Sequence, residues 1–269
     1  MSNLGKLVIF EGPDMCGKTT QLKYLKNLLE ANGKSVATFK YPLVDSKYGR
    51  NIYKLFGNKK ISVAERDCEI MRLEVLDKLD SVSAIVKAMK KNDYVLLDRY
   101  VLSQIIYDTA RYRLYVESES IFLDDINYMH RIISNNANCI IDNLIYAIIT
   151  ETHKYCARST RKIDIDKDII TVIFNSSNTV REAVEIYGRD RDDVDKNDRL
   201  QFDTSNIYDT CCDGYLPKSY NIGRFVSIDT DKIVFDNVEP QSKEITPSVY
   251  ERLAVASKLI PNKIYDAIK

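Results

Sequence analysis

The segment 12–19 has the residue types and the spacing of a phosphate-binding loop. Its sequence, GPDMCGKT, satisfies the pattern G-x-x-x-x-G-K-[ST]. Glycines let backbone N–H groups approach phosphate oxygens, while Lys18 can reach the β- and γ-phosphates and the Thr19 hydroxyl can take a Mg²⁺ position. We therefore expect ATP and Mg²⁺ to bind here. The residues expected around the phosphates are Gly12, Pro13, Asp14, Met15, Cys16, Gly17, Lys18, Thr19 and Thr20.

Asp98 and Arg99 form a second chemical feature, directly after the apolar run at residues 94–97. If that run is a strand, both residues lie at the carboxyl edge of a parallel sheet, where the ligands of open α/β folds collect. Asp98 is then placed to hold Mg²⁺ through water, and Arg99 can form a bidentate pair with a phosphate group. An ion pair at an exposed strand end is the alternative explanation.

The elements around these residues predict an α/β fold. The apolar runs with the length of buried strands are 7–10, 35–39, 94–97 and 169–174. Residues 18–31 and 61–91 carry apolar side chains at helical spacing, and strands that alternate with long helices indicate a parallel sheet covered on both faces. The loop at 12–19 then joins the first strand to the first helix, which favours a phosphate site over a ligand-free glycine turn.

The rest of the chain is expected to complete the same single domain. Residues 123–133 and 140–149 each have a helical pattern, whereas residues 134–138 are polar and predict a loop. Thr246 followed by Pro247 suits the start of a helix. The expected parts are a helical insertion at about 111–165, a last strand at 225–228 with a partner at 233–235, and a C-terminal helix at about 247–259.

The composition restricts the partners. Thirty-nine basic and 39 acidic side chains cancel, which disfavours nucleic acid and anionic membrane as partners and favours small molecules. The apolar runs at 95–97 and 169–174 are far shorter than the roughly 20 residues of a membrane span. The six cysteines form no CxxC pair, so neither a zinc site nor a disulfide framework is indicated, and we expect a cytoplasmic protein.

The motifs together resemble the thymidylate kinase family. The resemblance rests on the segment FEGPDMCGKTTQ at 10–21, on Asp98-Arg99-Tyr100, and on Ser103 downstream. Tyr41-Pro42 followed by Gly49 is similar to the substrate segment of that family, and residues 188–191 look like its lid. The resemblance implies a P-loop kinase fold with a lid at about 186–200. It covers roughly residues 5–107 and 168–235.

The resemblance also implies roles for individual residues. It implies that Asp14 orients the acceptor, that Arg99 grips the acceptor phosphate, and that the lid residues Arg189 and Arg191 neutralise charge on the migrating group. The expected catalytic residues are Lys18, Asp14, Arg99, Arg189 and Arg191. The expected substrate-binding residues are Tyr41, Pro42, Arg50, Glu74, Lys78, Arg99, Ser103 and Tyr107, with Thr19 and Asp98 at the metal. Members of the family are commonly homodimers.

The chain departs from the family pattern at the acceptor end. Val44 stands where the family usually has an arginine, and Lys40, Lys47 or Arg50 are the candidates to replace it. The base-stacking aromatic of the family falls at Glu74 here, and its base-binding arginine falls at Lys78. Neither is a close substitute, so a modified or different pyrimidine is an open alternative to thymine.

Four functions can be compared with these patterns. A kinase that transfers phosphate from ATP to a deoxynucleoside monophosphate needs cations at the acceptor, which Arg99 and the lysines provide. A deoxynucleoside kinase would need a carboxylate base near the second strand, and residues 38–42 contain none. A kinase acting on a modified base and an inactive nucleotide-binding protein remain as alternatives. The pattern favours the monophosphate kinase.

Overall fold

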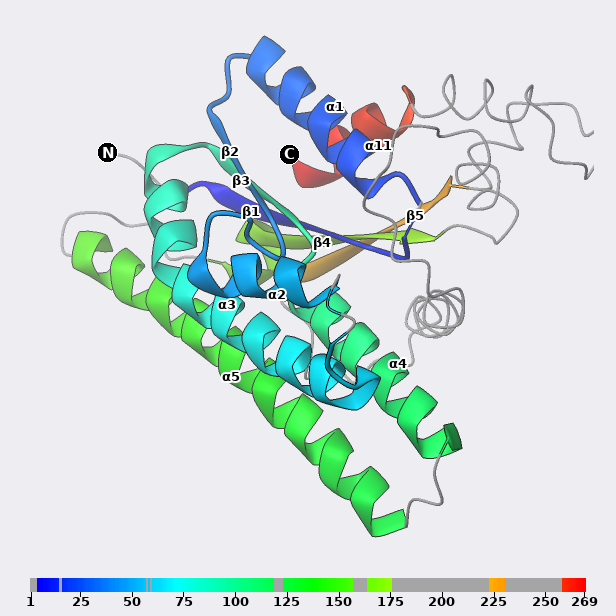
Figure 1. The fold of residues 1–269 in the computed structure, drawn as a ribbon. Helices are drawn as coiled ribbons and strands as arrows, with labels where there is room; N and C mark the ends of the chain where they lie inside the picture. Colours follow the sequence, from blue (N-terminus) through cyan, green and yellow to red (C-terminus); the bar gives the residue numbers. More distant parts are fainter. Residues whose placement is uncertain are drawn as a thin grey trace, which may run out of the picture.

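A five-stranded parallel sheet forms the centre of the molecule, in the order β2-β3-β1-β4-β5 (Figure 1). The computed structural model describes residues 4–14, 16–56, 58, 60–118, 123–156, 164–175, 223–230 and 258–269. The strands are β1 (Lys6–Glu11), β2 (Val36–Lys40), β3 (Tyr94–Asp98), β4 (Ile169–Asn175) and β5 (Arg224–Asp229). Every pair of neighbouring strands is parallel, so the predicted α/β fold class and the strands predicted at 7–10, 35–39, 94–97, 169–174 and 225–228 are confirmed. The strand predicted at 233–235 lies outside the described residues.

Alternating side chains of the central strand supply two separate cores. Leu7 and Ile9 of β1 pack into one apolar cluster, and Val8 and Phe10 pack into another on the opposite face of the sheet. All four side chains are buried. A strand that is apolar on both faces must be covered on both, which explains the uninterrupted apolar run in the sequence.

Helices cover the two faces as predicted (Figure 1). α1 (Lys18–Ala31) and α11 (Ile260–Ile268) contact each other and close the cluster around Val8 and Phe10. α3 (Val63–Lys91) and α5 (Leu123–Cys156) close the other cluster, with α4 (Val101–Ser118) packed against both. The start of α3 carries a capping box, in which the Ser62 side chain accepts from the Glu65 N–H and the Glu65 carboxylate accepts from the Ser62 N–H.

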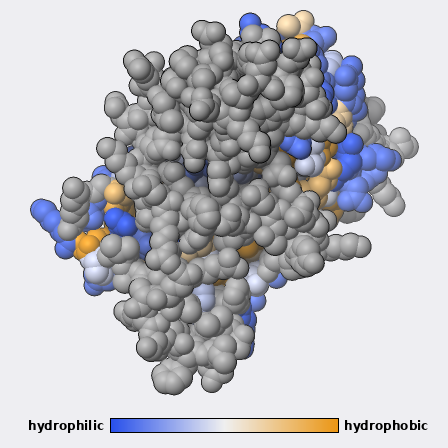
Figure 2. All heavy atoms as spheres, turned by 90° about the vertical axis from the view of Figure 1, so that its right-hand side faces the viewer, coloured by the Kyte–Doolittle hydropathy of each residue, from blue (hydrophilic) through white to orange (hydrophobic). Residues whose placement is uncertain are grey.

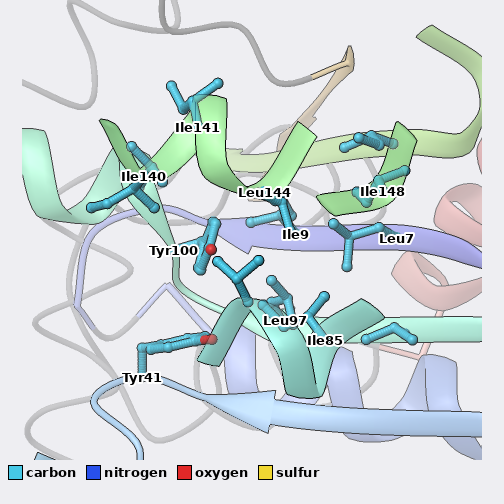
Figure 3. Close-up of a cluster of buried hydrophobic side chains, with 14 of the residues drawn as sticks. Leu7, Ile9, Tyr41, Ile85, Leu97, Tyr100, Ile140, Ile141, Leu144 and Ile148 are labelled. Atoms are coloured by element: carbon cyan, nitrogen blue, oxygen red, sulfur yellow. The ribbon is translucent and has the colours of Figure 1, made fainter. Parts of the chain in front are cut away.

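α5 is one continuous helix, so the loop predicted at residues 134–138 is wrong. The buried positions on its inner face are Ile133, Ala137, Ile140, Leu144 and Ile148, which follow helical spacing through the polar stretch. In Figure 3, Ile140, Leu144 and Ile148 lie over Leu7 and Ile9 of β1. Asn135 and Asn138 are exposed, so the polar stretch belongs to the outer face of a helix.

The apolar character of α5 is also sufficient, by length and composition alone, for a membrane span over Arg131–Glu151. Core helices of soluble proteins meet the same criterion. Here 33% of that stretch is buried, and the buried part includes Ile140, Leu144 and Ile148, which pack on the sheet. The expectation that the chain has no membrane partner stays a prediction.

Few large hydrophobic side chains are exposed among the described residues. In Figure 2, most of the coloured atoms on this side are hydrophilic, and hydrophobic atoms occur in small areas. The exposed large hydrophobic side chains among the described residues are Tyr24, Val44, Tyr53, Phe56, Tyr146 and Leu259. Tyr53 and Phe56 pack edge to face with ring centroids 6.0 Å apart on α2 (Lys47–Phe56).

The sequence did not indicate several elements. α2 and the short α6 (Ile165–Asp168) were not predicted, and residues 111–118 continue α4. Of the C-terminal helix predicted at 247–259, only residues 258–259 are described, and they form a turn that leads into α11. The lid at 186–200 lies outside the described residues. The division into one kinase domain with an insertion at 111–165 stays a prediction.

Candidate active site

The two glycines of the loop hold backbone conformations that other residues rarely adopt. Gly17, with a φ of 85°, immediately precedes α1, and Gly12 has a φ of 150°. A Cβ atom on Gly12 would lie 2.8 Å from the carbonyl oxygen of Phe174 and 3.0 Å from the Cys16 sulfur. The loop therefore needs glycine at position 12 for both space and conformation, as the motif predicts.

Lys18 is a buried cation inside this loop. Its ammonium group donates to the carbonyl oxygen of Pro13 and lies 3.5 Å from the sulfur of Cys16. Burial lowers the pKa of Lys18, and the neighbouring Arg99 lowers the pKa further. Two cations that disfavour each other in a buried loop would both be stabilised by an anion, so this site fits a polyphosphate.

Thr19 and Asp98, the two residues predicted at the metal, are in direct contact. The Thr19 hydroxyl donates to Oδ2 of Asp98 over 2.6 Å. The contact arises because β1 and β3 are neighbours in register, with Phe10 beside Asp98. No cluster of three or more His, Cys, Asp or Glu side chains occurs among the described residues. One hydroxyl and one carboxylate beside a phosphate site fit Mg²⁺, which usually binds few protein oxygens together with substrate phosphates.

Arg99 reaches from the end of β3 across to the loop. Its NH1 group donates to the carbonyl oxygen of Gly12 and to Oγ of Ser103, each over 3.1 Å, and NH2 forms an ion pair with Asp14. The backbone of Arg99 has a φ of 67°, which is the left-handed region that a residue with a long side chain rarely occupies. The predicted meeting of Arg99 with the loop is therefore a feature of the structure.

Asp14 and Tyr107 complete this group. The Tyr107 hydroxyl donates to Oδ2 of Asp14 over 2.6 Å, and the guanidinium of Arg99 lies 5.2 Å from the centre of the Tyr107 ring. Burial alone would raise the pKa of Asp14, but the charges of Arg99 and Lys18 and the bond from Tyr107 hold this pKa at about 2. Asp14 is therefore a carboxylate at neutral pH.

The segment after β2 is anchored under this site. Tyr41 is buried, its backbone N–H donates to the carbonyl oxygen of Asp98 over 3.0 Å, and its hydroxyl shares a 2.5 Å hydrogen bond with Ser81. The Tyr41–Pro42 peptide bond is cis. A Cβ on Gly49 would lie only 1.9 Å from the carbonyl oxygen of Leu43, so glycine is required where α2 packs on this segment.

Other residues near this segment that were considered for acceptor binding lie at the surface. Arg50 is exposed on α2 and donates to the carbonyl oxygen of Asp45 over 3.1 Å. The Pro42 carbonyl oxygen accepts from the Tyr53 hydroxyl over 3.2 Å. Val44 is 60% exposed, so the position where an arginine was expected carries an apolar side chain open to solvent.

Glu74 and Lys78 belong to a buried polar cluster between α3 and α4, with Gln104, Asp108 and Arg111. Lys78 donates to the side-chain oxygen of Gln104 over 2.7 Å, and the Gln104 amide donates to Asp108 over 2.7 Å. Arg111 lies 3.4 Å from Asp108 and 3.7 Å from Glu74. The cluster thus pairs two acidic with two basic side chains, and burial beside Glu74 raises the pKa of Asp108.

Three members of this polar cluster were missed in the sequence. Gln104, Asp108 and Arg111 are spaced by four and three residues along α4, which is one face of a helix. That spacing, beginning one residue after Ser103, was a usable signal. The two remaining catalytic candidates, Arg189 and Arg191, and the loop residue Met15 lie outside the described residues.

Part of the sequence matches one family of known proteins. Residues 10–126 match the family described as thymidylate kinase. A probable thymidylate kinase of Methanococcus maripaludis strain S2 is 35% identical over 108 residues, which are 40% of this chain and 49% of that protein. The thymidylate kinase of Desulfotalea psychrophila is 34% identical over 110 residues, or 40% of this chain and 52% of that protein. The matched part thus spans about half the length of these relatives.

A solved structure extends the likeness of the fold to nearly the whole chain. The structure of thymidylate kinase from Candida albicans superposes with a TM-score of 0.51, with 16% sequence identity, and covers 97% of this chain and 95% of that chain. At this identity the likeness concerns the fold. The resemblance to thymidylate kinases that the motifs indicate is confirmed over residues 10–126.

Proposed function

We propose that this chain, whose residues 10–126 match the thymidylate kinase family, transfers the γ-phosphoryl group of ATP to a deoxynucleoside monophosphate. The proposed acceptor is dTMP or a related or modified deoxypyrimidine nucleotide, and the product is the diphosphate. The observation that supports this most directly is the contact of Arg99 with Gly12 and Asp14 of the loop that holds Lys18. Two cations at one loop suit a reaction between two anions.

The donor end consists of the loop and the start of α1. Backbone N–H groups of residues 12–20 and the Lys18 ammonium would bind the ATP phosphates. Thr19 and Asp98 are the residues that would hold Mg²⁺, and the Thr19 hydroxyl oxygen lies 2.6 Å from Oδ2 of Asp98. The metal supplies positive charge to the donor phosphates. Closure of the predicted lid, with Arg189 and Arg191, would add countercharge and exclude water.

The acceptor end centres on Arg99 and Asp14. We infer that Arg99 binds the phosphate of the acceptor and that Asp14 orients the acceptor nucleotide. Since the pKa of Asp14 is held at about 2, Asp14 accepts hydrogen bonds at neutral pH and carries no proton to donate. A monophosphate acceptor is already anionic, so it needs charge and orientation rather than a general base. These properties favour a monophosphate over a nucleoside.

The base end is where this chain differs from the family pattern. We infer that Tyr41, Ser103 and Tyr107 surround the acceptor nucleotide. We also infer that the polar cluster with Glu74 and Lys78 faces the nucleobase of the acceptor. A buried cluster of charged and amide groups selects a ligand by hydrogen bonds, because a mismatched base would leave a buried polar group unpaired. The panel of acceptors must therefore include bases that differ in their donors and acceptors.

The proposal is tested by incubating the purified protein with ATP, Mg²⁺ and a panel of acceptors. The panel contains dTMP, dUMP, dCMP, 5-hydroxymethyl-dCMP and thymidine, and the products are identified by mass spectrometry. We expect a diphosphate from at least one monophosphate and no product from thymidine. Phosphorylation of thymidine alone, or of no acceptor at all, would contradict the proposal.

Two controls accompany this assay. ATP hydrolysis without acceptor is measured in parallel, so that hydrolysis is not counted as transfer. Arg72→Ala removes an arginine that pairs with Glu69 on the exposed face of α3, and we expect unchanged activity. A cytoplasmic location and a homodimer remain part of the proposal, and fractionation and light scattering test them.

A further inference from the structure

Glu11, the last residue of β1, is a fully buried carboxylate with an unusual set of partners. Its Oε1 accepts from the backbone N–H of Tyr100 over 2.8 Å, and its Oε2 accepts from the hydroxyl of Ser103. The Ser103 backbone also donates to it. Burial raises the pKa of Glu11, and these donors together with Arg99 oppose the rise. Burying a carboxylate away from water costs free energy, so its hydrogen-bond partners must compensate for the lost hydration.

The backbone contacts of Glu11 lie directly after Arg99 in the chain. Tyr100 directly precedes α4, and Ser103 is the third residue of that helix. A carboxylate from β1 therefore satisfies N–H groups at the start of α4, as a capping side chain would. Arg99 is the residue just before, and its own N–H donates to the Phe10 carbonyl oxygen over 2.9 Å. The end of β1 thus fixes both sides of the left-handed turn at Arg99.

The side-chain contacts of Glu11 continue to the guanidinium. The Ser103 hydroxyl donates its only proton to Glu11, so its oxygen is oriented to accept from NH1 of Arg99, 3.1 Å away. A chain of hydrogen bonds therefore runs from Arg99 through Ser103 to Glu11. The same NH1 group also donates to the Gly12 carbonyl oxygen, the residue next to Glu11 in sequence.

We propose that Glu11 is a positioning residue, which holds the backbone turn of Arg99 and, through Ser103, directs its guanidinium toward the acceptor phosphate. This inference rests on the proposed function, because it concerns the residue that would bind the acceptor. A strained conformation persists only where the surroundings determine it, and Glu11 provides two of the hydrogen bonds that do so. Arg99 also connects this network to Gly12 and Asp14 of the loop at residues 12–19, whereas Lys18 donates to Pro13 within that loop.

The test compares acceptor binding with ATP binding in Glu11→Gln. The substitution keeps the size of the side chain but replaces an acceptor by an NH₂ group facing donors. We expect the dissociation constant of the best acceptor, measured by calorimetry, to rise by about tenfold or more, as loss of a hydrogen bond to a charged group does. The dissociation constant of ATP should rise by a clearly smaller factor, because Lys18 and Thr19, which would hold the ATP phosphates and Mg²⁺, make their contacts to Pro13 and Asp98.

A double-mutant cycle separates positioning from general stability. Added to Arg99→Ala, the Glu11→Gln change should weaken acceptor binding by less than about twofold, because its effect acts through Arg99. Equal weakening of ATP and acceptor, or the same weakening with and without Arg99, would overturn the proposal. If Glu11→Gln does not fold, Ser103→Ala is the second variant, because it removes only the hydroxyl between Glu11 and Arg99. We expect it to weaken acceptor binding by a smaller factor, and again more than ATP binding.

A measurement without substrate keeps this inference separate from the proposed function. The side-chain Nε–H signal of Arg99 in an NMR spectrum is assigned by its absence in Arg99→Ala. In Glu11→Gln this signal should shift or broaden, while the signal of Arg72 stays in place. An unchanged Arg99 signal would refute the positioning role, whereas a failure of the wild type to bind any nucleotide would refute only the proposed function.

Discussion

Lys18 illustrates how single residues in this loop are arranged for a ligand rather than for the fold. It is buried, and burial and Arg99 together lower its pKa, so its charge costs folding free energy at neutral pH. We predict that Lys18→Ala lowers turnover by at least about 100-fold, as loss of one preorganised charge contact does, without lowering the melting temperature. Lys23→Ala, on the exposed side of α1, is the control and should leave turnover unchanged. Unchanged turnover in Lys18→Ala would remove this lysine from the mechanism.

Asp108 gives a pH dependence of stability. Burial raises the pKa of Asp108 to about 7, and the neighbouring Glu74 contributes to the rise. Between the value of about 3.9 for an unfolded Asp and this raised value, the folded protein binds more protons than the unfolded chain. The free energy of unfolding should therefore fall as the pH rises from 4 toward 7. Asp14, with its pKa at about 2, titrates below this range.

Asp108→Asn removes the titrating group and tests this dependence. We predict that the free energy of unfolding, measured with urea at pH 5 and pH 8, differs less between the two values in Asp108→Asn than in the wild type. Asp142→Asn, on the exposed side of α5, should behave as the wild type. Equal differences in all three proteins would show that Asp108 does not carry the effect.

The sequence predicted the site residues whose chemical role follows from the residue type and the motif. Lys18, Thr19, Asp98 and Arg99 stand in motifs with fixed spacing, and the structure brings them together. The positioning of Glu11 was not predictable from the motif, because a glutamate that ends a strand has no partner until β1, β3 and α4 are assembled. For the same reason, the polar cluster between α3 and α4 appears only when the two helices pack.

At the scale of elements, the sequence predicted the short apolar strands and the long amphipathic helices. For α5 it predicted two shorter helices separated by a loop instead of one continuous helix. Its polar residues at 134–138 gave the pattern of a loop, since the buried Ala137 is a weak apolar signal among three asparagines and a serine. The spacing from Ile133 to Ile140 is seven residues, which is two helical turns. Tertiary packing of this stripe on the sheet stabilises the helix where local propensity does not.

Proline at position 135 distinguishes a helix from a loop. Asn135 is exposed in the middle of α5, so Asn135→Pro should cost about 3 kcal/mol of stability or more, because it removes a backbone hydrogen bond and places the ring against the preceding turn. Asn135→Ala at the same position should be neutral or slightly stabilising. Urea unfolding measures both. A tolerated proline would indicate that the helix is interrupted there.

At the scale of the whole molecule, the parallel sheet explains why distant segments meet. Asp14 and Arg99 are 85 residues apart in sequence, and they pair because β1 and β3 are neighbours whose carboxyl ends lie at one edge. The loop after β1 and the turn after β3 therefore form one site only in the folded chain. A ligand that binds this site must stabilise the folded state.

ATP with Mg²⁺ should consequently raise the melting temperature. At about 100 times its dissociation constant, a ligand that binds only the folded state adds about 2.7 kcal/mol, which for a chain of this length corresponds to about 5–10 °C. Adenosine at the same concentration should give no shift, since we propose that this loop binds the phosphates of ATP. EDTA should reduce the shift, because Thr19 and Asp98 then hold no metal, and Lys18→Ala should abolish it. A wild-type melting temperature that ignores ATP would mean that the buried lysine and the glycine turns around it serve packing alone.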